Sequence, residues 1–511
     1  MIIARKKRVR GAETGARTRL NLERLEHRLL LDAGLDASTL VSAAAGSADS
    51  VRDIDTDYAA ASATGQDPAL VASREVDGVV VSVYDAKPGN GISEPDIAWD
   101  AREFARGKHE ILVQPGRAGD DRVSRITLLG PGAETTDLGL VVEGTLGRLV
   151  DRRTGASPLG FLVSEGRVGP VNLRSGIQGA NLNGFLSEGG WQLPADIDSD
   201  GASTDGTGLY GASGLARVIA RGDVNGDVVS GGSVNTVCVW GGDLNGDVAL
   251  TEGDLGRLIV RADRDPVGQE WIGSNITGDI AVPGSVWQLQ ALNGGVTGDI
   301  ETGGDVALVT SRGDVGGDIH VGGNLRKVQS IGGDITGTVR VDGNLGRLRA
   351  RGGSISGAVG TGGDAKLIES WGGDIAGDLH VGRNLGTVRA VRQRQGGNIA
   401  GDVTVEGAAV RVKACGGDIT GSVEVGGGLA SLVIHDGSLL ANVTVGSTSG
   451  TGGLKSLEVV DGDIVGNVHV AAGIRSIESR GPVRGGNIRG DIHAGAGLKA
   501  LYADANLSGD I

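Results

Sequence analysis

The fold is decided by the stretch Gly333-Asp334-Ile335-Thr336-Gly337-Thr338-Val339-Arg340-Val341-Asp342-Gly343-Asn344-Leu345-Gly346-Arg347-Leu348-Arg349-Ala350, because its pattern recurs along the chain. The same pattern returns as Gly373-Asp374-Ile375-Ala376-Gly377-Asp378-Leu379-His380-Val381-Gly382-Arg383-Asn384-Leu385-Gly386-Thr387-Val388-Arg389-Ala390. With Asp334 as the anchor, equivalent residues stand at positions 223, 243, 275, 295, 314, 334, 354, 374, 398, 418, 438, 463, 487 and 506, and seven of the thirteen spacings are 20 residues. Such a fixed period indicates a repeat fold, in which insertions map to loops.

The columns of this repeat have the chemistry of stacked β-strands. One and five places after the anchor all 14 residues are aliphatic, and three places after it 13 of 14 are glycine, with Ala441 the exception. Residues two apart on a strand point to the same side. In the quoted coil, the residues predicted to point inward are therefore Ile335, Gly337, Val339 and Val341, followed after a corner by Leu345, Leu348 and Ala350. Alternation broken by glycine turns every few residues predicts a β-solenoid.

We predict an all-β fold, a parallel β-helix of about 14 coils of about 20 residues, each stacked about 4.8 Å from the next. Left-handed β-helices are built from hexapeptides, and 20 is not a multiple of six, so we expect a right-handed helix. The coil length resembles that of filamentous haemagglutinin-type adhesins. This is a likeness of fold, which by itself implies no activity.

The chain divides into four regions: 1–35, a basic segment; 36–75, a flexible linker rich in Ala, Ser, Asp and Thr; 76–221, irregular; and 222–511, the β-helix repeats. The stretch Gly144-Thr145-Leu146-Gly147-Arg148-Leu149 matches residues 343–348, so we expect irregular β coils or a β-rich N-terminal cap in region 76–221. The sequence stops in mid-repeat at Ser508-Gly509-Asp510-Ile511, without the polar cap that a solenoid needs. We expect either that another chain shields the last coil, including by end-to-end self-association, or that the protein is longer.

Composition excludes several classes of protein. Of 511 residues, 94 are glycine and only 13 are aromatic, but glycine does not recur at every third position as in collagen. The 39% of hydrophobic residues argue against a disordered chain. A net charge of −15 disfavours a nucleic-acid partner, and no apolar run is long enough to span a bilayer. Cys238 and Cys415 stand about eight coils, roughly 38 Å, apart, which excludes a disulfide between them.

The basic segment predicts export. Residues 1–31 carry nine Lys or Arg against three Glu. The stretch Leu25-Glu26-His27-Arg28-Leu29-Leu30-Leu31 resembles the LEPR-XLL motif that opens large surface proteins of planctomycete-type bacteria, with His27 where that family has proline. The resemblance implies a bacterial cell-surface or extracellular location and rests on Leu25, Glu26, Arg28, Leu30 and Leu31. The alternative is an amphipathic basic helix with no targeting role.

One loop has the pattern of a calcium site. Asp196, Asp198 and Asp200 alternate before Gly201, which lets a tight turn wrap Ca²⁺, and the pattern resembles EF-hand and dockerin-type loops. Thr204 stands at the ninth position, and Asp205 is the acidic residue nearest the twelfth, which is Thr207. The alternative is an acidic turn that leads into the solenoid, and a calcium-dependent folding module is the corresponding hypothesis for the whole protein.

Two columns of the repeat carry polar side chains. The anchor column mixes Asp, Asn and Ser, which is typical of turns whose side chains bond a nearby backbone N–H. Four places after the anchor, five successive coils carry an acidic ladder, which either is solvated or binds Ca²⁺ that relieves its repulsion. Its members are Asp227, Asp247, Asp279, Asp299 and Asp318.

Histidine and tryptophan each allow two interpretations. Four histidines share one outward column, which indicates a surface column rather than a metal site; they are His320, His380, His469 and His493. Trp240, Trp271, Trp287 and Trp371 either cover the ends of the apolar core, as we expect, or stack on sugar rings.

No catalytic cluster is evident in the sequence. We therefore expect a non-catalytic surface or secreted β-solenoid, a structural stalk or adhesin whose partners are cell-envelope components or polysaccharide. The alternative is a polysaccharide lyase or hydrolase on the same fold. The longest insertion, which contains Asp263, Arg264 and Asp265, is the feature that supports the enzyme.

Overall fold

The computed structural model describes residues 69–76, 79–85, 97–99, 103–104, 108–113, 122–130, 138–154, 158–179, 206–264, 271–272, 274–391, 397–446, 452–481 and 486–511. All of them belong to the compact unit Ser62–Ile511. The described residues contain strands, bridges and turns and no helix, so the prediction of an all-β fold is confirmed. None of them forms a helix with the length and apolar character needed to cross a bilayer.

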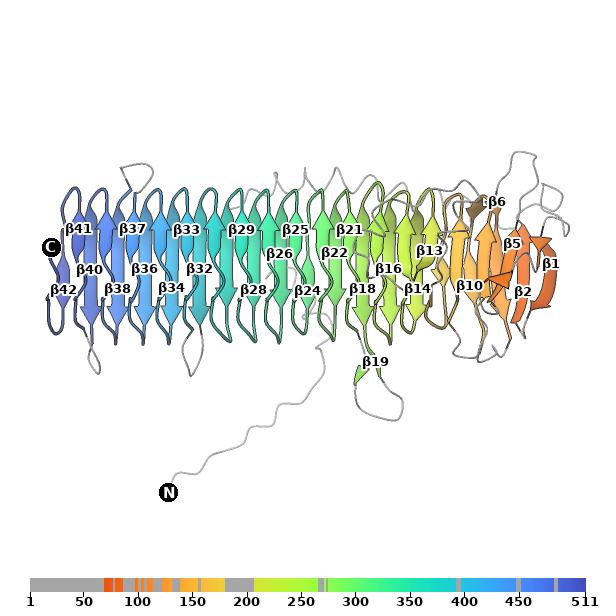
Figure 1. Cartoon of the computed structure of the whole chain (residues 1–511), viewed down its shortest axis with the longest axis horizontal. Coiled ribbons are helices and arrows are strands. Elements are labelled where there is room, and N and C mark those ends of the chain that lie inside the picture. Colours follow the sequence, from red (N-terminus) through yellow and green to blue (C-terminus); the bar gives the residue numbers. More distant parts are fainter. Residues whose placement is uncertain are drawn as a thin grey trace, which may run out of the picture. The chain divides into compact units, whose positions relative to one another are not determined.

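One long side of every coil contributes to a parallel sheet, which we call the long-strand sheet (Figure 1). Each strand pairs with its equivalent one coil before and one coil after. In order of pairing, the strands are β7 (Arg125–Leu129), β10 (Leu149–Asp151), β12 (Val171–Asn172), β14 (Leu215–Arg221), β16 (Val234–Trp240), β18 (Leu255–Arg261), β22 (Val286–Ala291), β24 (Val309–Ser311), β26 (Leu325–Ser330), β28 (Leu345–Ala350), β30 (Ala365–Ser370), β32 (Leu385–Val391), β34 (Ala409–Cys415), β36 (Leu429–His435), β38 (Leu454–Val460), β40 (Ile474–Arg480) and β42 (Leu501–Ala503).

A second side of every coil forms the short-strand sheet, whose neighbouring strands also pair in parallel. Its strands are β5 (Lys108–Val113), β8 (Leu138–Val142), β11 (Phe161–Ser164), β13 (Thr207–Gly211), β15 (Asp227–Ser230), β17 (Val248–Leu250), β21 (Ile280–Val282), β23 (Ile300–Thr302), β25 (Ile319–Val321), β27 (Val339–Val341), β29 (Val359–Thr361), β31 (Leu379–Val381), β33 (Val403–Val405), β35 (Val423–Val425), β37 (Val443–Val445), β39 (Val468–Val470) and β41 (Ile492–Ala494).

The third side of each coil is a single residue joined to its neighbours by isolated parallel bridges. This column begins at Leu159 and Ile177, passes through Ile335 and ends at Leu507; it has sixteen members and fifteen bridges. The structure is therefore a parallel β-solenoid of about 16 turns of roughly 20 residues, two more than predicted. The additional turns lie before residue 222, where the repeat is irregular in sequence and the strands still stack in parallel.

Antiparallel strands cover the N-terminal side of the coil stack. The hairpin of β1 (Ala69–Val76) and β2 (Val79–Asp85) pairs through β2 with β7, the first strand of the parallel series. In the short-strand sheet, β3 (Ile97–Ala98) and β4 (Glu103–Phe104) pair antiparallel with β5. Two further short strands, β6 (Arg122–Val123) and β9 (Thr145–Leu146), pair in parallel. Since an uncovered edge strand can pair with other chains, these strands protect that edge.

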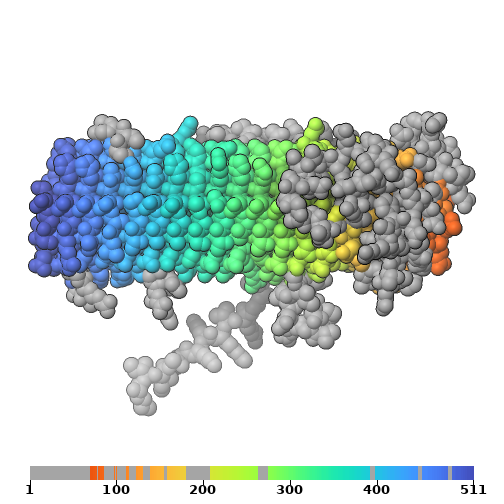
Figure 2. All heavy atoms as spheres, in the orientation of Figure 1, coloured from red at the N-terminus to blue at the C-terminus, as the bar shows by residue number. Residues whose placement is uncertain are grey.

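The core is a continuous aliphatic column. In the coil of β27 and β28 the six predicted aliphatic core residues are all at most 1% exposed: Ile335, Val339, Val341, Leu345, Leu348 and Ala350. Thr336, Thr338 and Arg340 are exposed on the outer side, as the alternation predicts. Successive coils lie against one another in sequence order in the space-filling view (Figure 2). No coil can bury its apolar face alone, so stability comes from stacking.

Alternation does not explain why the residue three places after the anchor is glycine in almost every coil. A Cβ at Gly337 would overlap the carbonyl oxygen of Gly317, its equivalent in the previous coil, and the same overlap recurs at Gly357 and Gly377. The φ of Gly337 lies outside the left-handed region. Glycine is therefore required here by close backbone approach between coils rather than by turn conformation.

This distinction predicts different effects for two glycines of neighbouring coils. Gly337→Ala forces backbone apart between coils, and we expect it to lower the free energy of unfolding by about 1–3 kcal/mol. Gly360→Ala is the matched control, because a Cβ at Gly360 meets nothing within 4 Å, and its effect should stay within about 0.5 kcal/mol. Denaturant unfolding followed by circular dichroism measures both, and equal effects would contradict the close-approach account.

Candidate functional site

The aspartates of the acidic ladder form hydrogen bonds between coils. In each of its five aspartates, Oδ1 accepts the backbone N–H of the equivalent residue in the next coil, at N···O distances of 2.6–2.9 Å. The last of these bonds joins Thr338 N to Asp318 Oδ1. The carboxylates therefore each have an N–H donor, and their stacking serves to join the coils.

The anchor column forms a similar ladder at a second corner of the coil. Of its thirteen steps from residue 223 to residue 506, twelve carry a hydrogen bond from a backbone N–H to the side chain one coil earlier, at 2.6–3.1 Å. The exception follows Gly295, which has no side chain. Asp, Asn and Ser interchange because each offers an oxygen acceptor near the backbone. The partner lies one coil away along the stack, whereas turn statistics predict a partner within the same turn.

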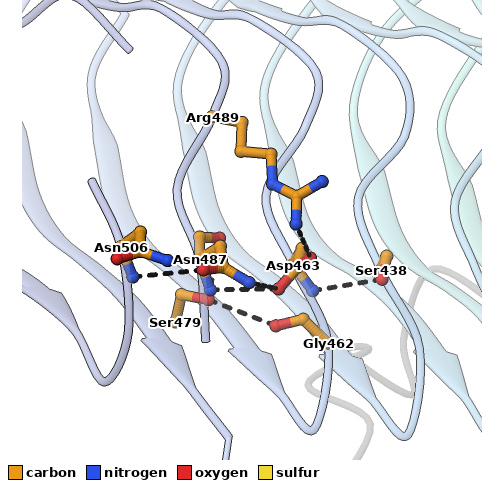
Figure 3. Close-up of polar contacts among 7 residues, drawn as sticks. All are labelled: Ser438, Gly462, Asp463, Ser479, Asn487, Arg489 and Asn506. Carbon is orange, nitrogen blue, oxygen red and sulfur yellow. Dashed lines mark hydrogen bonds and ion pairs between the residues drawn. The ribbon is translucent and has the colours of Figure 1, made fainter. Parts of the chain in front are cut away.

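Figure 3 shows three consecutive steps of this ladder. Asp463 N donates to Ser438 Oγ at 3.1 Å, Asn487 N to Asp463 Oδ1 at 3.0 Å, and Asn506 N to Asn487 Oδ1 at 3.1 Å. The other carboxylate oxygen of Asp463 lies 3.3 Å from the Arg489 guanidinium. The side chain of Asp463 thus bonds backbone on one side and a surface arginine on the other.

A third ladder occupies the corner between the short and the long strand. It runs without a gap through eight steps from Ser233 to Ala408, with N···O distances of 2.6–3.2 Å. At Ala408 the acceptor side chain is lost, and the following members are the glycines 428, 453, 473 and 497. All three corners of the central coils are therefore tied to the coils beside them.

The other metal candidates are the histidine column and the calcium loop. Among the described residues, no three His, Cys, Asp or Glu side chains are grouped as a metal site would need. His469 and His493 stack as parallel rings 4.8 Å apart, while His320 lies 3.9 Å from Glu301 and 3.8 Å from Asp342. The calcium loop (Asp196, Asp198, Asp200, Thr204 and Asp205) and the targeting motif (Leu25, Glu26, Arg28, Leu30 and Leu31) lie outside the described residues.

The enzyme alternative relied on the longest insertion. The sequence predicted this insertion at residues 256–271. Residues 256–261 belong instead to the regular strand β18, so the insertion begins after Arg261. Asp263 and Arg264 form β19 (Asp263–Arg264), which pairs antiparallel with β20 (Trp271–Ile272) as a hairpin outside the coil stack (Figure 1). Asp265 lies outside the described residues.

The outward side of the long-strand sheet concentrates positive charge. From β14 to β34, over ten coils, three positions per coil point outward. They are the positions equivalent to Arg347, Arg349 and Arg351, and we call all thirty of them the basic face. One acidic residue, Glu369, stands among twelve basic ones: Arg217, Arg221, Arg257, Arg261, Arg312, Lys327, Arg347, Arg349, Arg351, Arg389, Arg411 and Lys413. The face thus has a formal charge of +11 on a chain of −15.

Glu369 is the centre of a compact charged cluster on this face. It is 4% exposed, and its carboxylate lies 2.9 Å from Arg349 Nε and 3.5 Å from Arg389 Nε. The same two guanidinium groups lie 5.1 and 4.9 Å from the centre of the Trp371 ring. A buried carboxylate needs such partners. The cluster therefore holds Glu369 between two arginines.

Two tryptophans stand on the basic face rather than over the ends of the core. Trp240 lies between Arg221 and Arg261, whose guanidinium carbons are 5.4 and 4.1 Å from the ring centre. Trp371 is 39% exposed beside its two arginines. Trp287, on β22, is 47% exposed. The interpretation as core covers is therefore wrong for Trp240 and Trp371, whose rings pack against arginine in cation–π contacts.

Crowding of like charges affects the titration of this face. Burial and then the charges of Arg347, Arg351 and Arg349 lower the pKa of Lys327. Burial raises the pKa of the Cys238 thiol, and the nearby arginines offset this only in part. Both cysteines are free, in agreement with the exclusion of a disulfide. A raised pKa disfavours the reactive thiolate, so Cys238 has the chemistry of a packing residue.

The signal for the basic face was present in the sequence. In Arg347-Leu348-Arg349-Ala350-Arg351 every second residue is arginine, so alternation places all three on the outer side of one strand. The overall charge of −15 conceals this face, because acidic residues dominate elsewhere.

The ladders predict a specific cost for removing one acceptor. Asp334 Oδ1 accepts the Ser354 N–H at 2.6 Å, and Ile335 N donates to Ser354 O at 2.9 Å. Asp334→Ala leaves the Ser354 N–H without its partner, and we expect a loss of about 1 kcal/mol in the free energy of unfolding. Asp334→Asn keeps the oxygen and should lose less.

Asp342→Ala is the matched control from the same coil. Asp342 lies 3.8 Å from His320 and 3.6 Å from Arg340, and such exposed contacts between charged groups contribute little to stability. Denaturant titration measures all three variants. An Asp342→Ala effect as large as that of Asp334→Ala would contradict a structural role for the ladder.

Comparisons with known proteins assign this chain to no family. No family model matches the sequence, no curated protein is similar to it, and no solved structure matches its fold. The function must therefore be inferred from the residues of this chain.

Proposed function

We propose that this protein is a non-catalytic β-solenoid that serves as a structural stalk or adhesive rod on the bacterial cell surface or outside the cell. The observation that carries the proposal is the set of ladders at the coil corners. Over the anchor column alone, twelve of thirteen coil-to-coil steps carry a side-chain hydrogen bond in addition to the sheets. Such links resist bending and separation of coils, which is what a stalk requires.

The chemistry of the basic face supports the absence of glycoside hydrolysis on that face. Glycoside hydrolases use a pair of carboxyl groups on either side of the scissile bond. The basic face carries the single acidic residue Glu369, which is buried between Arg349 and Arg389. The location is supported by the LEPR-XLL resemblance of residues 25–31.

The location is tested on intact cells. Protease is added to cells that produce the protein, and the protein is followed by immunoblotting with an antibody against a coil of the repeat region. We expect it to be digested while a cytoplasmic marker stays intact, because a surface protein is accessible. Protection of the protein until the cells are lysed would contradict a surface role.

The absence of catalysis is tested separately with the purified protein and a panel of acidic and neutral polysaccharides. We expect no new reducing ends and no unsaturated products. Their appearance would favour the polysaccharide lyase or hydrolase instead. A variant Glu369→Gln is the control, since loss of product in that variant would place the chemistry on the basic face.

A further inference from the structure

The basic face is an interaction surface with strong charge asymmetry. It spans ten successive coils, or nine intervals of about 4.8 Å, which is roughly 43 Å along the stack. Its formal charge is +11, and the acidic residues of the same coils stand mainly in the corner ladders, where they bond backbone N–H groups. On β38 and β40 the same columns carry Glu458, Glu478 and Arg480. Toward the N-terminus the same columns continue with Arg148, Arg152 and Arg174, so the positive charge runs along the sheet as far as β34.

The crowding on the basic face has an energetic cost that an anion relieves. Arg347, Arg349 and Arg351 project from one strand, and Lys327 stands directly beside Arg347 on the neighbouring strand. These arginines contribute to the lowered pKa of Lys327, after its burial. Glu369 balances only one of these charges. Like charges at this spacing repel, so an anionic partner gains both direct contacts and relief of that repulsion.

The arrangement of the aromatic side chains favours an acidic polysaccharide over a nucleic acid as the anionic partner. Proteins that bind single-stranded nucleic acid stack successive bases on aromatic rings. Here Trp240 and Trp371 stand six coils apart, roughly 29 Å, and each is flanked by two arginines. Duplex recognition places a helix, a ribbon or an arm in a groove, whereas this surface is the side of a sheet. A polymer that carries one carboxylate on each ring needs neither feature.

We propose that the basic face binds a linear acidic polysaccharide, a polyuronate, along the direction of coil stacking. Arginines bind carboxylates through paired N–H donors. The exposed part of Trp371 offers an apolar surface to a sugar ring beside Arg351. The inference rests on the proposed function, because a surface or secreted rod meets such polymers.

The test uses the full chain and polygalacturonate as the probe, with isothermal titration calorimetry at two salt concentrations. We expect binding that weakens as salt rises, because charge contacts release counterions. Dextran, which is neutral, should not bind, and a single-stranded oligonucleotide should bind at least about tenfold more weakly than polygalacturonate. Absence of polygalacturonate binding, or equal affinity for the oligonucleotide, would overturn the proposal.

A pair of double variants locates the surface. Arg347→Gln with Arg351→Gln removes two exposed charges of the basic face, and we expect affinity to fall roughly tenfold. Arg340→Gln with Arg383→Gln is the control, because it changes net charge equally, on the same coil and two coils further on, but off this face, and its effect should stay below about twofold. Circular dichroism shows whether both variants are folded. Equal losses in the two variants would overturn the assignment to this face.

The same samples separate this proposal from the proposed function. After titration, the length of the polygalacturonate is measured by size-exclusion chromatography. Binding without shortening supports both proposals. Shortened polymer would overturn the non-catalytic function while it leaves the basic face as the binding surface, and an intact polymer without binding overturns only the inference.

Discussion

The structure depends on one constraint: at each corner of a coil, backbone N–H groups must find acceptors where the sheets are interrupted. A buried or half-buried N–H without a partner is costly. The chain meets this with short polar side chains that reach one coil along the stack, as Asp334 does for Ser354. The same constraint explains why Asp, Asn and Ser interchange at these positions. Close backbone approach is a separate constraint, and it places glycine where a Cβ would overlap a carbonyl oxygen of the previous coil, as at Gly337.

The ladders also separate the charges of the molecule. Aspartates occupy the corners, where one oxygen of each carboxylate accepts a backbone N–H. Arginine and lysine predominate on the outer side of the long strands. A chain of −15 therefore carries a basic face of +11. Net charge predicts how the whole molecule behaves at a distance. It does not predict what a single face binds, because contact surfaces respond to the charges within about one Debye length.

The repeat allowed most of the fold to be predicted, because alternation and period are local properties of a sequence. The inward direction of Ile335, Val339 and Leu348 follows from parity alone. The early coils, which contain Leu159 and Ile177, do not follow the regular repeat of the sequence. Their number is evident only from the bridges between coils. The acidic ladder was ambiguous for the same reason. Whether Asp299 faces a cation or an N–H depends on where the next coil lies.

The sequence by itself determined the solenoid, its coil length and its aliphatic core, because each depends on residues close together along the chain. Tertiary structure alone decided which atoms meet between coils. Asp463 and Asn487 are 24 residues apart and share a hydrogen bond, and Arg349 and Arg389 meet at Glu369 from the coils on either side of it. Stacking at about 4.8 Å brings such residues together. The repeat aligns these residues in columns, but which side-chain atom reaches which partner depends on how the coils stack.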